Sequence, residues 1–319
     1  MTLYKGIQGF SVQNLSADPT DPNEGQVWYN STSNVWKLTS ATTAGAWATG
    51  GNLNTARSLS TGAGTQTAGL AFGGIDPTAA TGATELYNGT SWTNNPTGLN
   101  TARWALGGTG TQTSALAFGG RTPSTFIVTA TEEYDGSTWT SNPTGLNTAR
   151  NYIVGAGTQT AALGFGGSAP AITGATEEYD GSTWTTSPGS LNTARTELSG
   201  CGTQTAGLAF GGIVTPMSNA TEEYDGTSWA TSPGTMNTAR RELGGAGIQT
   251  AALAFAGNLP GNSSATEEYD GSTWTSTTSM ATARKGIGGL GTQSSALGMG
   301  GETTANTAAT EEWTGAGSP

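Results

Sequence analysis

The chain has 319 residues, a formal net charge of −11, a single cysteine and no histidine. This composition provides no His/Cys zinc site, no disulfide within the chain and no histidine general base. It has only 11 lysines and arginines, too few for a basic surface that binds nucleic acid, and no apolar run approaches the length of a membrane span. We therefore expect no enzyme activity, no cofactor, no metal, no nucleic-acid partner and no membrane insertion.

The first 45 residues differ from the rest of the chain. Residues 1–13 show a mild alternation of apolar side chains, and the ADPTDPNE stretch (17–24) is rich in turn-forming residues. Residues 25–38, GQVWYNSTSNVWKL, predict a hairpin of two aromatic strands around a Ser-Thr-Ser-Asn turn. This start resembles the N-terminal attachment segment of some bacteriophage tail-fibre and virion proteins. The alternative is a generic exposed hairpin that packs on the following domain.

From residue 46 onward the chain consists of repeats. Thr-Ala-Arg recurs six times, with spacings of 44 to 47 residues between successive arginines. A glutamine and a double glycine recur in step with it, and Ala256-Gly257 is the one degenerate copy of the glycine pair. A period of this length is typical of solenoids and propellers.

Each unit is predicted to form four short strands. Around Arg150 the expected strands are residues 131–134, 137–140, 151–156 and 159–165. Side chains alternate with period two in the last of these, and Asp-Gly between the first two predicts a hairpin turn. Four strands in about 45 residues is the size of one propeller blade. We therefore predict an all-β fold, a six-bladed β-propeller over residues 46–319 that follows a separate segment of residues 1–45.

The two ends of the repeat region are incomplete and complementary. Residues 46–49 (AWAT) match the fourth strand of a unit, and residues 309–313 (ATEEW) match a third strand with no fourth strand after it. We predict that the N-terminal strand completes the sixth blade and closes the ring, which removes a free sheet edge. The alternative partner for this blade is residues 35–38.

The order of the repeated residues resembles the kelch repeat: an arginine, a strand of small residues, a strand that ends in Gly-Gly, then Tyr-Asp and Trp. The resemblance covers residues 46–319 and implies a kelch-like propeller. The spacing departs from that family, because Tyr134 and Trp139 lie closer together than in kelch units and the unit is slightly shorter. The Asp-Gly-Ser-Thr-Trp run also resembles the Asp box of sialidase propellers, although it is one residue shorter.

The repeated charged residues are predicted to be structural, because six identical copies suit architecture whereas an active site needs one asymmetric group. We expect each arginine to form an ion pair or a carbonyl contact that fixes neighbouring strands. The alternative is a ring of carboxylates that binds calcium or a sugar. The fourth-strand tryptophans are expected to pack between blades. The charged positions are Arg57, Arg103, Arg150, Arg195, Arg240, Arg284, Glu85, Glu132, Glu177, Glu222, Glu267 and Glu311.

The loops that follow the double glycines differ in every unit. In kelch-like propellers these loops lie on one face, and variable loops on a rigid scaffold are the usual form of a binding surface. Unconstrained sequence drift is the alternative interpretation. The loops are residues 75–82, 121–129, 168–174, 213–219, 258–264 and 302–308. The candidate ligand-binding residues are Arg121, Phe126, Ile127, Ile172, Ile213, Met217 and Leu259.

The sequence thus predicts a non-enzymatic protein of a phage particle, associated with the tail or its fibres and active in adsorption to a host. Its expected partners are other virion proteins, bound through residues 1–45, and a glycan or protein on the host surface. The alternatives are a purely structural virion component, such as a capsid decoration or tail-assembly protein, and a cellular protein- or glycan-binding module. The oligomeric state is left open, and a homo-oligomer is one option.

Overall fold

The computed structural model describes residues 13–19, 27–38 and 44–316. The chain divides into two compact units, residues 1–44 with 316–319 and residues 45–315. The alternation predicted over residues 1–13 falls, apart from Gln13, outside the described residues. The same holds for most of the turn-rich stretch 17–24, of which residues 17–19 are described.

The smaller unit contains a three-stranded sheet in the order β1-β2-β3, formed by β1 (Gln13–Leu15), β2 (Val27–Asn30) and β3 (Val35–Leu38). Strands β2 and β3 pair in antiparallel fashion, which confirms the predicted hairpin. Strand β1 pairs parallel to β2, with Leu15 opposite Asn30.

One loop residue, Asp18, connects the strands of this small sheet. Its carboxylate accepts hydrogen bonds from Trp28 Nε1 (3.0 Å) and Asn30 Nδ2 (2.7 Å), and Lys37 Nζ lies 2.8 Å away. The bonds from Lys37, Asn30 and Trp28 lower the pKa of Asp18 to about 2. The carboxylate therefore stays ionised well below neutral pH, and its bonds tie Asp18 to β2 and β3.

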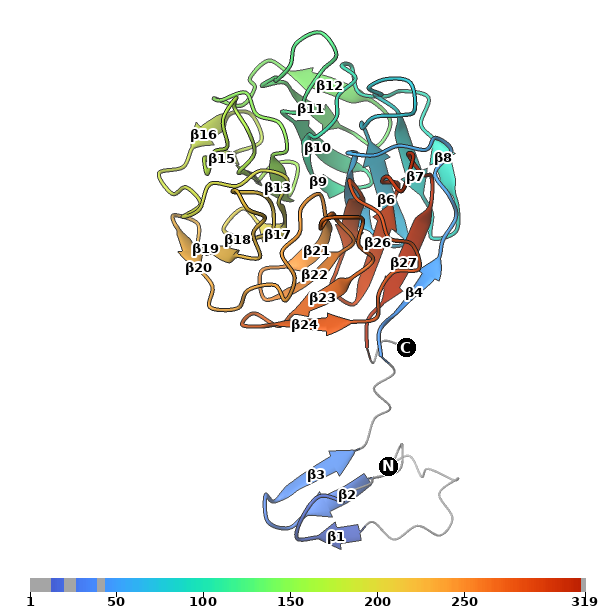
Figure 1. Cartoon of the computed structure of the whole chain (residues 1–319), viewed down its shortest axis with the longest axis vertical. Helices are drawn as coiled ribbons and strands as arrows, with labels where there is room; N and C mark the ends of the chain where they lie inside the picture. Colours follow the sequence, from blue (N-terminus) through green and yellow to red (C-terminus); the bar gives the residue numbers. More distant parts are fainter. Residues whose placement is uncertain (1–12, 20–26, 39–43, 317–319) are drawn as a thin grey trace, which may run out of the picture. The chain divides into compact units, whose positions relative to one another are not determined.

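The larger unit consists of six four-stranded antiparallel sheets that surround a centre as the blades of a propeller (Figure 1). The innermost strands are β5 (Thr61–Thr65), β9 (Gly107–Thr111), β13 (Val154–Gly157), β17 (Ser199–Thr203), β21 (Gly244–Ile248) and β25 (Gly288–Gly291). The second strands are β6 (Ala68–Phe72), β10 (Ser114–Phe118), β14 (Ala162–Phe165), β18 (Ala206–Phe210), β22 (Ala251–Phe255) and β26 (Ser295–Met299).

The two outer strands of each blade carry the acidic and tryptophan positions of the repeat. The third strands are β7 (Thr84–Tyr87), β11 (Thr131–Tyr134), β15 (Thr176–Tyr179), β19 (Thr221–Tyr224), β23 (Thr266–Tyr269) and β27 (Thr310–Thr314). The fourth strands are β8 (Trp92–Asn94), β12 (Trp139–Asn142), β16 (Trp184–Thr186), β20 (Trp229–Thr231), β24 (Trp274–Thr277) and β4 (Ala46–Thr49). The predicted six-bladed all-β fold is confirmed.

The sixth blade joins the two ends of the repeat region, as predicted. Strand β4 pairs with β27, with Ala46 opposite Thr314 and Thr49 opposite Glu311. The sheet order β25-β26-β27-β4 completes the ring. The alternative partner, residues 35–38, is wrong, because those residues form β3 and pair with β2.

Three predicted strand starts are wrong by two or three residues. Strand β13 begins at Val154 rather than at residue 151, because Tyr152 has a left-handed backbone conformation with φ of 52°. Strand β12 begins at Trp139 rather than at residue 137, because the N–H groups of Ser137 and Thr138 donate to the Asp135 carboxylate instead of to a strand (2.8 and 2.7 Å). Strand β14 begins at Ala162 rather than at residue 159, because residues 158–161 form a turn in which the Thr158 N–H donates to the carbonyl oxygen of Ala161 at 2.9 Å. In all three places local hydrogen bonding or backbone geometry delays the start of the ladder.

Adjacent blades are held together by an aromatic pair. At the interface between the second and third blades, Phe118 from β10 packs on Trp184 from β16, with ring centroids 4.7 Å apart. The indole Nε1 of Trp184 donates to Thr131 Oγ1 of the neighbouring blade at 2.9 Å. The closing strand repeats this arrangement, because Trp47 lies 5.0 Å from Phe255. The prediction that the tryptophans pack between blades is confirmed, and such pairs stabilise beyond the area that they bury.

Glycines on the inner strands provide the space for these aromatic rings. A Cβ atom on Gly155 would lie 2.6 Å from the carbonyl oxygen of Gly108 and 2.9 Å from Cζ of Phe118. Real Cβ atoms do not approach other atoms this closely, so any side chain at this position pushes two blades apart. The glycine of the inner strand is therefore required by close approach between blades.

We expect Gly155→Ala to lower the free energy of unfolding by about 1–3 kcal/mol, the usual cost of overpacking a well-packed interior. Gly261→Ala is the matched control, because a Cβ atom there would meet nothing within 4 Å. Urea unfolding followed by tryptophan fluorescence measures both variants. Equal stability of the two variants would contradict the close-approach argument.

The repeated glutamine also links blades, a role that the sequence did not suggest. Gln159 Nε2 donates to the carbonyl oxygens of Ala115 (3.0 Å) and Tyr134 (2.7 Å) in the preceding blade. Gln66 makes the same pair of bonds across the closure, to Ala296 (3.0 Å) and Trp313 (2.8 Å). These glutamines lie at the turn between the first two strands, at the end of the blade opposite the double glycine.

Candidate functional site

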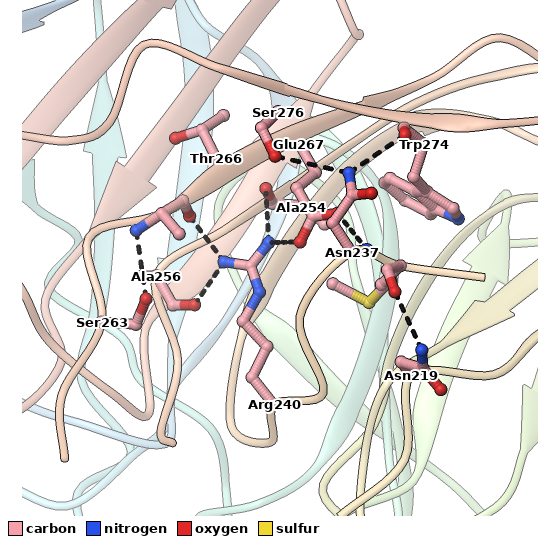
Figure 2. Close-up of polar contacts among 12 residues, drawn as sticks. Asn219, Asn237, Arg240, Ala254, Ala256, Ser263, Thr266, Glu267, Trp274 and Ser276 are labelled. Carbon is pink, nitrogen blue, oxygen red and sulfur yellow. Dashed lines mark hydrogen bonds and ion pairs between the residues drawn. The ribbon is translucent and has the colours of Figure 1, made fainter. Parts of the chain in front are cut away.

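The repeated arginines and glutamates form buried ion pairs, shown for the fifth blade in Figure 2. Arg240 Nη2 lies 2.9 Å from Glu267 Oε1, and Nη1 donates to the carbonyl oxygens of Ala256 (2.9 Å) and Ala265 (2.5 Å). The other carboxylate oxygen of Glu267 accepts the N–H of Asn237 at 2.6 Å. The same pair recurs in all six blades at 2.7–3.1 Å. The predicted pairing is confirmed.

Each arginine also connects its own blade to the preceding one. The guanidinium of Arg240 binds the fifth blade, while its backbone carbonyl accepts the N–H of Gly212, in the fourth blade, at 2.8 Å. Burial lowers the pKa of the Arg240 guanidinium, and the carboxylate of Glu267 opposes that shift. Because this glutamate is buried and both of its oxygens are engaged, these residues do not form the exposed ring of carboxylates that was the alternative.

The second acidic residue of the repeated Glu-Glu pair is structural as well. Glu178 accepts a hydrogen bond from the hydroxyl of Tyr224 in the next blade at 2.5 Å. Burial and then this bond raise the pKa of Tyr224 to about 12. The first blade has Leu86 at this position, and there the hydroxyl of Tyr134 is bonded to Asn95 instead. The same tyrosine bond is formed by Glu133, Glu223 and Glu312, so the acidic residues that make it serve the architecture.

The non-repeating residues gather at one end of every sheet. The residue that follows each arginine forms a bridge with the residue that follows the double glycine, as in Trp104 with Arg121 and Thr196 with Ile213. The variable loops therefore lie beside the linkers that enter each inner strand. We refer to the six variable loops, together with the two residues after each repeated arginine, as the variable face. The opposite ends of the sheets carry the repeated glutamine and Asp-Gly turns.

The candidate ligand-binding residues all lie on the variable face and retain some exposure. Phe126 is 69% exposed and Ile172 is 37% exposed, whereas the others are half-buried. The half-buried residues are Arg121, Ile127, Ile213, Met217 and Leu259.

The structure brings some of these candidates together. The Arg121 guanidinium lies 4.6 Å from the ring centroid of Phe126 and 5.5 Å from that of Trp104. Ile213 forms a backbone β-bridge with Met217 within one loop. Ile172 and Leu259 lie on separate loops of other blades. Among the predicted residues, only Arg121 and Phe126 form a clear side-chain group. Trp104, which was not predicted, completes that group.

A second group on the variable face was missed entirely. The second residue after each repeated arginine has a left-handed backbone, with φ between 51° and 59°. Five of these residues donate a backbone hydrogen bond, 2.7–3.0 Å long, to the carbonyl of the equivalent residue in the preceding blade. All six line a central cavity of about 270 Å³. We refer to them as the mouth ring: Leu59, Ala105, Tyr152, Glu197, Glu242 and Gly286.

Charged side chains gather on one part of the mouth ring. Glu197 Oε2 lies 2.8 Å from Arg241 Nη1, and Glu242 Oε2 lies 4.0 Å from Lys285 Nζ. Burial, and then the charges of Glu197 and Glu242, raise the pKa of Tyr152 to about 12, so its hydroxyl is a permanent donor at neutral pH. Burial and the neighbouring Glu197 also raise the pKa of Glu242.

The signal for the mouth ring was present in the sequence. Aligning the units on the repeated arginine shows a different residue type two positions later in almost every unit. The Thr-Ala before the arginine and the Gly-x-Gly of the inner strand repeat, whereas both positions directly after the arginine vary. Only the left-handed geometry places the second of these positions around one cavity.

No family model matches the chain, and no curated protein matches it. Within the part of the chain that the structure describes, no helix is long and apolar enough to cross a membrane. The described residues also hold no cluster of three or more His, Cys, Asp or Glu side chains that could bind a metal ion.

Proposed function

We propose that this chain is a non-enzymatic protein of a phage particle and that its kelch-like propeller binds a glycan or protein on the host surface. Residues 1–45 attach it to other virion proteins. The observation that carries this proposal is the segregation of variable and repeated positions. The positions that differ from blade to blade lie on the variable face, whereas the repeated polar residues make contacts within and between blades.

Two further observations support the proposal. The Trp104, Arg121 and Phe126 group offers exposed aromatic surface beside a cation, which is typical of binding sites. In the smaller unit, Trp36 is 65% exposed. This unit lies in the N-terminal segment, whose sequence resembles the attachment segment of some phage proteins. An exposed tryptophan on such a segment suits contact with another protein.

The place in the particle is tested by immunogold electron microscopy with an antibody against residues 46–319. Phage particles are taken from the culture in which the chain is produced. Label at the tail or its fibres supports adsorption, and label over the capsid supports a decorating role instead. Particles without label overturn the virion part of the proposal.

Ligand binding is tested with the fluorescently labelled full chain and bacterial cells from the same culture. We expect Phe126→Ala to weaken binding about tenfold, a typical loss for an exposed aromatic anchor. Ile248→Ala is the matched control, because Ile248 is 52% exposed at the opposite end of its blade. Equal loss in both variants would remove the argument that the variable face is the binding surface.

A further inference from the structure

We propose that the mouth ring binds one neutral sugar residue at the entrance of the central cavity, with Tyr152, Glu197 and Glu242 as its hydrogen-bonding groups. This inference rests on the proposed function, because it names the ligand class and the place on the variable face.

The cavity itself suits a small polar ligand. Its walls are the inner strands β5, β9, β13, β17, β21 and β25, each of which is an edge strand of its sheet. Edge strands carry backbone N–H and C=O groups that no neighbouring strand satisfies. The volume of about 270 Å³ lies near the lower end of ligand pockets. Sugar hydroxyls both donate and accept, so they match a wall of mixed backbone groups.

The backbone links of the mouth ring are broken at one place, next to Tyr152. Five of the six links between neighbouring ring residues are formed, and the link from Glu197 N–H to Tyr152 C=O is not. The Tyr152 hydroxyl, in addition, has no hydrogen-bond partner among the described residues. One sector of the ring therefore keeps a backbone donor, a backbone acceptor and a phenol hydroxyl that no neighbouring ring residue engages.

The side chains of the ring favour an amphipathic, uncharged ligand. Arg241 pairs with Glu197, and Lys285 is shared between Glu242 at 4.0 Å and Glu302 at 3.7 Å. The two cations offset most of this acidic charge without exceeding it, so an anionic ligand gains no net attraction. The carboxylates still accept hydrogen bonds through oxygens that the cations do not occupy. Leu59 and Ala105 complete the ring with apolar groups. A pyranose has the matching faces, because its C–H groups contact apolar side chains while its hydroxyls meet the polar sector.

The test is ligand-observed saturation-transfer NMR on the full chain with four probes: the methyl glycosides of glucose, galactose, mannose and N-acetylglucosamine. At least one probe is expected to bind. We expect Tyr152→Phe and Glu242→Gln each to weaken binding of that probe about tenfold, the loss of one hydrogen bond to a ligand. Tyr152→Phe is the cleaner variant, since its hydroxyl has no hydrogen-bond partner within residues 44–316, and unchanged thermal unfolding confirms its fold. Ile248→Ala is the control that leaves binding unchanged.

Three other outcomes overturn the inference and separate it from the proposed function. If the chain binds cells but none of the four glycosides, the proposal that the variable face binds the host stands and the proposal of a sugar site at the mouth ring fails. If Phe126→Ala weakens binding of a glycoside whereas Tyr152→Phe and Glu242→Gln do not, that glycoside binds at the variable loops and not at the mouth ring. Absence of both cell binding and glycoside binding removes the proposed function together with this inference.

Discussion

Arg240→Ala is expected to lower the free energy of unfolding by about 3–5 kcal/mol, the usual cost of removing one partner from a buried ion pair. The variant leaves the carboxylate of Glu267 buried without its cation. It also leaves the carbonyl oxygens of Ala256 and Ala265 without their shared donor. Because the backbone of Arg240 also holds the preceding blade, the damage extends to the interface between the two blades.

The neighbouring arginine provides the control. Arg241 pairs with Glu197 at a similar distance of 2.8 Å, but its side chain is 32% exposed. We expect Arg241→Ala to cost less than about 1 kcal/mol, as is usual for ion pairs that water reaches. Denaturant unfolding at equilibrium measures both variants. Similar losses for Arg240→Ala and Arg241→Ala would show that burial of the repeated pair is not what matters.

Trp47→Ala is expected to lower the free energy of unfolding by about 3 kcal/mol, the lower end of the range for large-to-small aromatic changes because the ring is only partly buried. Trp47 contacts Phe255 and Trp313 and donates to Thr266 Oγ1 at 3.0 Å. Its loss weakens the hold of β4 on the sixth blade. Exposure of the β27 edge then also favours association between molecules.

Trp36→Ala is the control for this second variant, because Trp36 is an exposed tryptophan in the smaller unit. Thermal unfolding by circular dichroism and size-exclusion chromatography on heating are the measurements. We expect Trp47→Ala to unfold earlier and to form oligomers, and Trp36→Ala to behave as the parent chain. If Trp47→Ala unfolds at the parent temperature, closure by β4 contributes little to stability.

Much of the fold could be predicted because the sequence repeats it. Six copies of one pattern identify which residues recur in register, and the orphan strands at residues 46–49 and 309–313 indicate how the ring closes. The pairing of Arg150 with Glu177 could be predicted because the chain has one such arginine and one such glutamate in each unit. The packing of Trp184 between blades could be predicted from the large apolar area of its ring. Each of these inferences depends on a position that all or nearly all units share.

The mouth ring, the Trp104–Arg121 contact and the glutamine links could not be predicted, because they depend on backbone geometry that the residue types do not indicate. Tyr152, Glu197 and Glu242 are not typical left-handed residues, yet all three adopt that conformation at the same place in their units. The contact of Trp104 with Arg121 likewise requires knowledge that a linker and a loop form a bridge. The linking role of Gln159 depends on which end of the neighbouring blade it reaches.

The mixed origin of the sixth blade affects the order in which the protein is made and folded. Five blades consist of contiguous chain, so each can form its hairpins as soon as it is synthesised. Strand β4 is the first strand of the propeller to leave the ribosome, but its Trp47 contacts a residue 219 positions later and the strand pairs with β27, later still. The first strand of the propeller to be synthesised is therefore the last to pair, and the growing propeller carries an open edge until β27 has been synthesised.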